Sequence, residues 1–126
     1  MTDTTHTPDQ DDLQSLVGDW LDWAACGEAL GISVSRVRQL IKEHQLAATV
    51  PVPGKGQKIP AALLDGGLVV KGVPGVLTVL HDGGYDDRES IQWLFSEDDT
   101  LPGRPIDALR ENRGSEVKRR AQAMAF

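Results

Sequence analysis

The stretch LGISVSRVRQLI, residues 30–41, is the most informative part of the sequence. Gly31 suits a turn that demands a positive φ, because glycine adopts that conformation without strain. Ser33 is a favoured helix N-cap and predicts a helix from Val34 to His44. The stretch therefore predicts the end of one short helix, a tight turn and a second helix.

The residues before this turn supply the first helix of the pair. Asp22 can cap a helix that runs from about Trp23 to Leu30. Gly27 lies where two crossing helices would come closest, and a side chain there would push them apart. Two short helices around a tight turn form a helix-turn-helix, whose second helix enters the major groove of DNA.

The helix expected at 34–44 has two different faces. At about 100° per residue, its apolar side chains share a face roughly 120° wide: Val34, Val37, Leu40 and Ile41. The other face carries residue types that bond base edges and phosphates. We predict base contacts for Ser35, Arg36 and Gln39, because the N-terminal part of such a helix enters deepest. We predict phosphate contacts for Arg38 and Lys42.

A β-hairpin is expected directly after this helix. Residues 46–50 and 58–59 are predicted strands, and PVPGKGQ (residues 51–57) is a turn rich in proline and glycine. Lys55 and Lys58 lie at and beside its tip, where they would touch the DNA backbone or minor groove. The PGKG segment is not a P-loop, which needs G-x-x-x-x-G-K-[ST] between a strand and a helix. A helix-turn-helix followed by such a hairpin is a winged helix.

The overall charge of −6 is unfavourable for DNA binding, but it is unevenly distributed. Residues 33–58 carry five basic side chains against Glu43, a net charge of +4. Residues 1–12 carry −4 and residues 82–99 carry −6. DNA responds to the face that it meets, because charges beyond a Debye length of about 8 Å are largely screened. The distribution is therefore compatible with double-stranded DNA as a partner.

Other features favour a small cytoplasmic protein without catalytic or metal sites. The N-terminus lacks a secretory signal, and no apolar run approaches the roughly 18 residues of a membrane span. The single cysteine, Cys26, is expected to be a small buried helix residue, and no cysteine and histidine spacing suits zinc. No nucleophile, base or carboxylate pair has a supporting context, so we predict neither an enzyme nor a cofactor.

The pattern predicts a mainly α-helical chain with a small β-hairpin wing, in three parts. Residues 1–12 are expected to be a disordered acidic tail, residues 13–71 a winged helix-turn-helix, and residues 72–126 a helical C-terminal domain. A kinase could reach the tail, where phosphate would add negative charge and weaken DNA binding. The candidate phosphorylation sites are Thr7, Thr5 and Thr4.

Several motifs resemble known DNA-binding families. The run from Trp23 to Leu46 resembles the winged helix-turn-helix of MerR- and excisionase-like regulators. The chain from about Leu13 resembles a family of small actinobacterial DNA-binding proteins, through LGISVSRVRQLI, VKGVPGVLTVLHDGGY, IQWLF, GRPIDAL and VKRRAQAMAF. The resemblance implies an N-terminal winged helix, a helical C-terminal domain, a regulatory or nucleoid-associated role, and a link to Ser/Thr kinase signalling. It implies no particular phosphorylated residue, because the tail matches no family pattern.

Two alternatives stay open for the C-terminal part. Lys118, Arg119 and Arg120 could extend the DNA-contacting surface, or they could face the acidic residues 97–99. The segment GRPIDALRENRGSEVKRRAQA also faintly resembles the toxin-binding domains of antitoxins, which implies an adaptor whose main partner is another protein. Salt separates the two classes, because a DNA binder loses affinity as salt rises.

Overall fold

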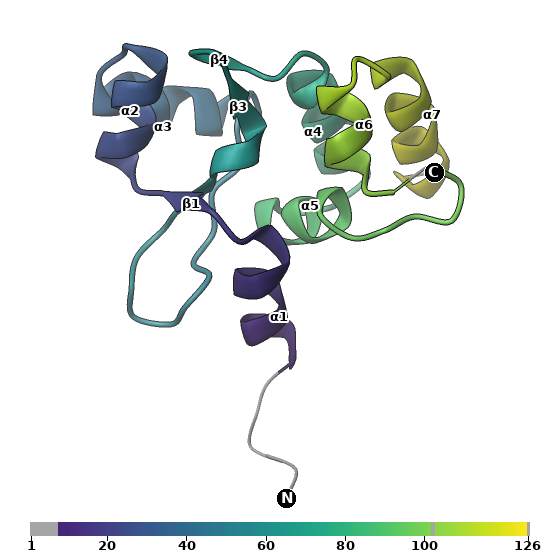
Figure 1. The fold of residues 1–126 in the computed structure, drawn as a ribbon, viewed down its shortest axis with the longest axis horizontal. Helices are drawn as coiled ribbons and strands as arrows, with labels where there is room; N and C mark the ends of the chain where they lie inside the picture. Colours follow the sequence, from purple (N-terminus) through teal and green to yellow (C-terminus); the bar gives the residue numbers. More distant parts are fainter. Residues whose placement is uncertain (1–7, 102, 126) are drawn as a thin grey trace, which may run out of the picture.

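The computed structural model describes residues 8–101 and 103–125. Figure 1 shows the α2–α3 pair on one side, helices α4, α6 and α7 on the other, and the short strands between them. The elements in chain order are α1 (Pro8–Val17), β1 (Trp20–Leu21), α2 (Trp23–Leu30), α3 (Val34–Lys42), β2 (Ile59–Pro60), the 3-10 helix η1 (Ala61–Leu63), β3 (Leu64–Asp65), β4 (Leu68–Val69), α4 (Val73–Asp82), α5 (Asp87–Leu94), α6 (Pro105–Arg110) and α7 (Gly114–Ala125). The prediction of a mainly helical winged fold followed by a helical C-terminal domain is confirmed.

The helix-turn-helix forms through the expected local signals. The Asp22 carboxylate accepts a hydrogen bond from the Ala25 amide at 2.7 Å and so caps α2. Gly31 ends α2 with φ +71°, and the Ser33 hydroxyl accepts from the Arg36 amide at 3.1 Å to start α3. Each cap satisfies an amide that the helix itself leaves unpaired.

Helix α3 is shorter than the predicted span of 34–44. It ends at Lys42, Glu43 is its C-cap, and His44 adopts a φ of +60°. The left-handed backbone conformation of His44 ends the helix and turns the chain away from the helix axis. The buried residues 46–49 then lead into the wing.

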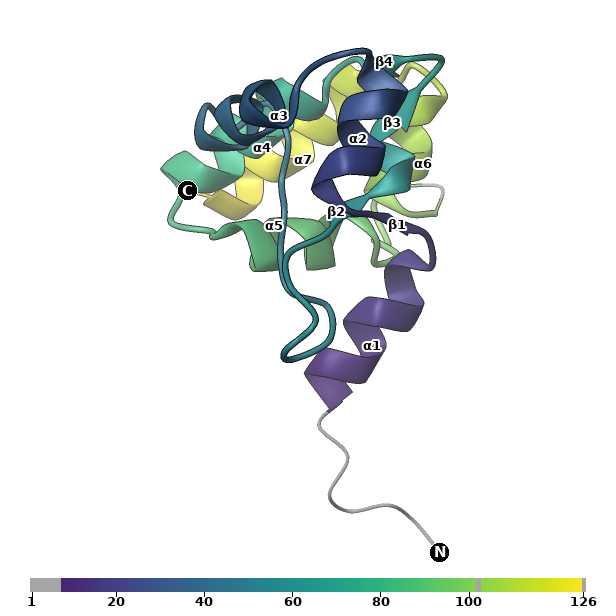
Figure 2. The ribbon, with the colours of Figure 1, turned by 90° about the vertical axis from the view of Figure 1, so that its left-hand side faces the viewer.

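The wing differs from the predicted hairpin in its pairing. Only Thr49 and Lys58 pair across it: the Thr49 amide donates to the Lys58 carbonyl at 3.1 Å, and the Lys58 amide donates to the Thr49 carbonyl at 2.7 Å. Pro51 and Pro53 lack the amide hydrogen that a longer ladder would need. Figures 1 and 2 show the resulting loop projecting from the body on the same side as α1.

Strand β2 pairs with a strand that the sequence did not suggest. It lies antiparallel to β1, with Leu21 opposite Ile59 and Trp20 opposite Pro60. The segment before α2 thereby holds the second arm of the wing. A second antiparallel pair joins β3 to β4 around Gly66 and Gly67.

Helix α1 begins at Pro8, so residues 8–12 of the expected tail are helical in the structure. Proline suits the first turn of a helix, because its missing amide hydrogen would be unpaired there anyway. Leu13 is buried and joins the core. The candidate phosphorylation sites Thr4, Thr5 and Thr7 lie outside the described residues.

The C-terminal helices pack around an apolar centre in which α4 lies against α7 and α5 contacts α4. Asp86 and Glu89 form a capping box at the start of α5. Helix α7 begins at Gly114 and buries Val117 and Ala121. The core runs without a break from the winged part into these helices, so both parts share buried side chains. None of the helices within the described ranges is long and apolar enough to span a membrane.

Candidate nucleic-acid interface

Helix α3 presents the predicted contact residues to solvent. All five are exposed: Ser35, Arg36, Arg38, Gln39 and Lys42. Val37 is fully buried on the opposite side, and Leu40 and Ile41 are partly buried against the same core. The structure thus brings these five side chains onto one accessible surface, which we call the α3 face.

Gly27 lets α3 lie close to α2. A β-carbon built on Gly27 would be 2.8 Å from the carbonyl oxygen of Ile32 and 3.7 Å from Cγ2 of Val37. The first distance is shorter than real contacts of this kind, so a side chain at position 27 would push the turn away. The glycine therefore allows the short distance between α2 and the turn that leads into α3.

Arg38 is held by an aromatic ring. Its guanidinium carbon lies 5.7 Å from the centre of the Trp23 ring, within the range of a cation–π interaction. Trp23 begins α2, so the contact joins the two helices of the pair. Arg38 is thereby placed at the flank of the α3 face, a position suited to a phosphate.

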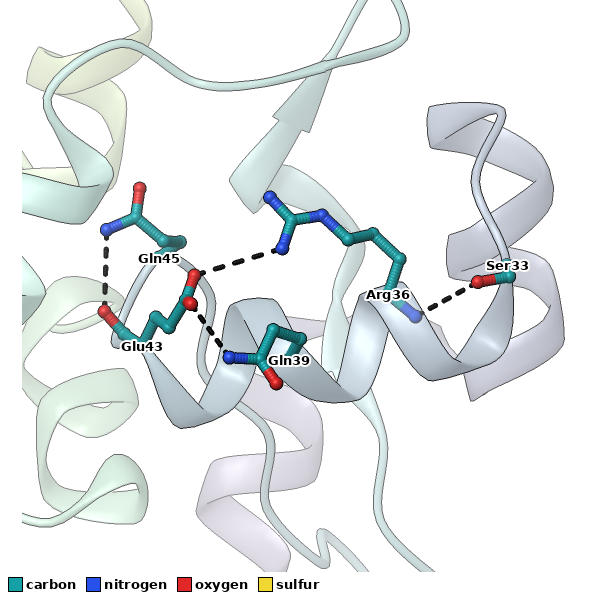
Figure 3. A network of polar contacts seen from close by, with 5 residues as sticks. All are labelled: Ser33, Arg36, Gln39, Glu43 and Gln45. Carbon is teal, nitrogen blue, oxygen red and sulfur yellow. Dashed lines mark hydrogen bonds and ion pairs between the residues drawn. The ribbon is translucent and has the colours of Figure 1, made fainter.

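Arg36 and Gln39 share one acidic partner, Glu43. Figure 3 shows both side chains directed along α3 toward the Glu43 carboxylate. Gln39 Nε2 donates to Glu43 Oε2 at 2.7 Å, and Arg36 Nη1 lies 3.9 Å from Glu43 Oε1. The side chains of Arg36 and Glu43 remain 53% and 47% exposed. The carboxylate therefore stands among the groups predicted to meet base edges.

The wing carries its two lysines on the side nearest α1. Lys55 is exposed, Lys58 is half-buried, and both line a groove with Gln14 of α1 and Trp20 of β1. The Lys55 amide donates to the Val52 carbonyl at 3.1 Å and closes the turn at the tip. The groove therefore lies between α1 and the wing.

One residue predicted to lie in the core is instead exposed. Val34 has 42% of its surface accessible, because the core covers α3 only from its second turn, beginning at Val37. An apolar side chain at the first position of this helix can contact the methyl group of thymine. The sequence analysis placed Val34 in the core and did not name it as a candidate contact residue, although its place directly after the N-cap Ser33 was visible.

Glu43 and Trp23 were also missed. The signal for Glu43 was present, since Gln39 and Glu43 are four residues apart and such helical neighbours interact. The cation–π partner of Arg38 was not visible from spacing, because Trp23 lies on a different helix.

The open question about the C-terminal cations is answered in part. Arg120 Nε lies 3.2 Å from Asp98 Oδ2, so Arg120 faces the acidic loop, whereas Lys118 and Arg119 are exposed. Thr100 hydrogen bonds, with a further contribution from Arg120, lower the pKa of Asp98 to about 2. Asp98 and Arg120 therefore form an internal contact of the C-terminal part.

Cys26 is buried as predicted, and burial raises the pKa of its thiol. A thiol held in its neutral form is a poor nucleophile and metal ligand. Among the residues that the structure describes, no three histidine, cysteine, aspartate or glutamate side chains gather as a metal site.

The chain is similar to known proteins over most of its length. Residues 7–64 match the family model described as "DNA-binding protein Rv2175c, wHTH domain", and residues 70–125 match "Rv2175c C-terminal domain of unknown function". DNA-binding protein Rv2175c of Mycobacterium tuberculosis (strain ATCC 25618 / H37Rv) is 42% identical over 118 residues, covering 83% of this chain and 80% of the relative. The NMR structure of Rv2175c superposes with a TM-score of 0.77 at 40% identity, over 86% of this chain and 82% of that one. The chain therefore belongs to the Rv2175c family, which joins a winged helix-turn-helix to a helical C-terminal domain.

Proposed function

We propose that this chain binds double-stranded DNA through the α3 face and the wing, as a regulatory or nucleoid-associated protein of the cytoplasm. The observation that carries the proposal is the α3 face itself, five exposed polar and basic side chains on the second helix of a helix-turn-helix. The name of the Mycobacterium tuberculosis relative, a DNA-binding protein, supports the same function.

The side chains divide by the part of DNA that they suit. Ser35, Arg36 and Gln39 lie in the first two turns of α3, which enter the major groove most deeply, and we assign them to base edges. Arg38 and Lys42 flank them, and we assign both to phosphates.

The wing supplies a second point of contact. We assign Lys55 and Lys58 to the DNA backbone, since both line the groove between the wing and α1. The wing loop leaves the body on the same side as α1 (Figure 2). A backbone contact carries no sequence information, so it should strengthen binding to every duplex alike. Together with the α3 face, it offsets the acidic total charge, because DNA meets the basic surface first.

We further propose that phosphorylation of the tail, by a Ser/Thr protein kinase, lowers the affinity for DNA. Helix α1 contributes Gln14 to the groove that Lys55 and Lys58 line, so the helix that follows the candidate sites in the chain lies beside the wing. A phosphate there would add about −1.5 to −2 charge near the surface that DNA approaches. The candidates are Thr7, Thr5 and Thr4, of which Thr7 should be tested first, by replacement with glutamate.

Fluorescence anisotropy of a labelled duplex, measured from low to moderate salt, tests the proposal. The wild-type protein should bind less tightly as salt rises, and the Arg36→Ala/Arg38→Ala double variant should lose binding. Lys55→Ala should weaken binding to all duplexes and reduce the salt slope by about 0.9. Arg113→Ala, which removes a cation from the turn between α6 and α7, is the matched control and should bind normally.

Two outcomes would count against the proposal. Equal binding by the double variant and the control would mean that the α3 face is wrongly assigned. No binding by the wild-type protein at low salt would instead favour the antitoxin-like or adaptor role, in which the main partner is another protein. A pull-down with the intact chain would then identify that partner.

A further inference from the structure

An acidic side chain lies at the C-terminal end of the surface proposed to read DNA. The Glu43 carboxylate accepts a hydrogen bond from Gln39 at 2.7 Å and lies 3.9 Å from the Arg36 guanidinium (Figure 3). Both partners are residues assigned above to base edges. A carboxylate in this place is repelled by every phosphate that approaches α3, so its presence weakens binding that depends on charge alone.

The contact with Arg36 changes what this arginine can bind. While its guanidinium lies beside Glu43, part of its charge is neutralised and it is a poorer partner for a phosphate. The ion pair is exposed, and exposed pairs contribute little to stability, so a better partner can replace it. Guanine is such a partner, because O6 and N7 together accept two hydrogen bonds from one guanidinium.

The contact with Gln39 fixes the direction of an amide. With one Nε2 hydrogen donated to Glu43, Gln39 keeps its oxygen as an acceptor and its second N–H as a donor. Adenine offers the complementary pair at N6 and N7. Glu43 thereby leaves Gln39 with a defined donor and acceptor on the α3 face.

We infer that Glu43 is a specificity-determining residue, which positions Arg36 and Gln39 for bases and disfavours binding where DNA offers only phosphates. The inference rests on the proposed DNA-binding function. At a matched site, Arg36 exchanges the carboxylate for guanine, and a cytosine amino group can donate to the carboxylate that is released. At an unmatched site the carboxylate faces the DNA without such a donor.

Two replacements distinguish the effect of the Glu43 charge from the effect of its side-chain length. Glu43→Gln keeps an acceptor for Gln39 but removes the charge that holds Arg36. Glu43→Asp keeps the charge on a side chain one methylene shorter, which no longer reaches Arg36 from a starting distance of 3.9 Å. Glu116→Gln, an exposed site on α7, removes the same charge far from α3 and is the control.

The experiment measures anisotropy with two duplexes over a range of salt. One is recovered by the wild-type protein from a random pool, and the other is its scrambled counterpart. Glu43→Gln should bind the scrambled duplex about threefold to tenfold more tightly, with a salt slope steeper by about 0.9, because Arg36 becomes free for one more phosphate. The selected duplex should gain less, so the ratio of the two affinities should fall. Glu43→Asp should also steepen the slope, and Glu116→Gln should change neither quantity.

Three results would overturn the inference while leaving DNA binding intact. The first is an equal gain on both duplexes with Glu43→Gln. The second is a Glu43→Asp protein that behaves like wild type, which would reduce Glu43 to a simple surface charge. The third is a wild-type protein that binds duplexes but enriches no sequence from the pool. A wild-type protein that binds no duplex would refute the proposed function itself. Circular dichroism melting checks the fold of each variant, and the half-exposed Glu43 should tolerate each change.

Discussion

The close approach of α2 and α3 at Gly27 can be tested by adding one methyl group. In a helix, replacing glycine by alanine stabilises the protein by about 1 kcal/mol when the site has room. At Gly27 the new β-carbon would lie 2.8 Å from the Ile32 carbonyl oxygen, a backbone atom that cannot rotate away. Overpacking of this kind costs about 1–3 kcal/mol. Gly27→Ala should therefore lower the free energy of unfolding by up to about 2 kcal/mol, after the helical gain is subtracted.

Gly75 provides the matched control within the same chain. It lies in helix α4, and a β-carbon built there meets no atom within 4 Å. Gly75→Ala should raise the free energy of unfolding by up to about 1 kcal/mol. The difference between the two variants cancels the helical gain and isolates the overpacking, about 1–3 kcal/mol.

Urea unfolding followed by circular dichroism measures the free energy of unfolding of both variants. The slope of this free energy against urea concentration should be the same for both, which checks that their unfolded states are alike. The same proteins should then be assayed for DNA binding. The Gly27→Ala protein should also bind DNA more weakly, because a displaced turn at Ile32 changes the position of α3 relative to α2. If Gly27→Ala were as stable as Gly75→Ala, the close approach would be wrong, and with it the account of how α3 is positioned.

Two further predictions concern single side chains. Val34→Ala should leave the free energy of unfolding within about 0.5 kcal/mol of wild type, because the side chain is exposed. In a selection of duplexes from a random pool, the same variant should show a preference for thymine at one position that is weaker by about 1 kcal/mol. Asp98 has a folded pKa of about 2, below its unfolded value of about 3.9, so its stabilisation is complete above the unfolded value and is lost as pH falls through the folded one. Asp98→Asn should therefore lose roughly 1 kcal/mol near pH 6 and show a smaller decline between about pH 4 and pH 2, which urea titrations across that range would measure.

The elements that the sequence predicted well depend on contacts between near neighbours. Asp22 and Ser33 each cap an amide three residues away. Such signals are complete within a few residues, so they can be recognised without knowing the fold. The exposure of the α3 face follows from the helical spacing of its polar residues, which is also a local pattern.

The features that sequence reasoning missed depend on distant segments. Strand β2 pairs with β1, which lies 39 residues earlier, and nothing in either dipeptide indicates the other. Val34 lies on the apolar arc of α3 by periodicity alone, yet the core does not reach the start of that helix. The start of α1 at Pro8 was missed because the acidic composition of residues 8–12 resembles a tail.

The C-terminal part helps to position the proposed DNA-binding surface, through contacts that are also non-local. Asp87 of α5 accepts a hydrogen bond from the Ala48 amide at 3.2 Å, and Arg88 donates to the Val50 carbonyl at 3.1 Å, so α5 holds the arm that enters the wing. At the end of α3, the His44 ring stacks on His81 of α4 with 3.7 Å between the ring centres. A winged helix meets DNA at two places whose separation must match the grooves. Because α4 and α5 contact the end of α3 and the base of the wing, we expect them to set that separation.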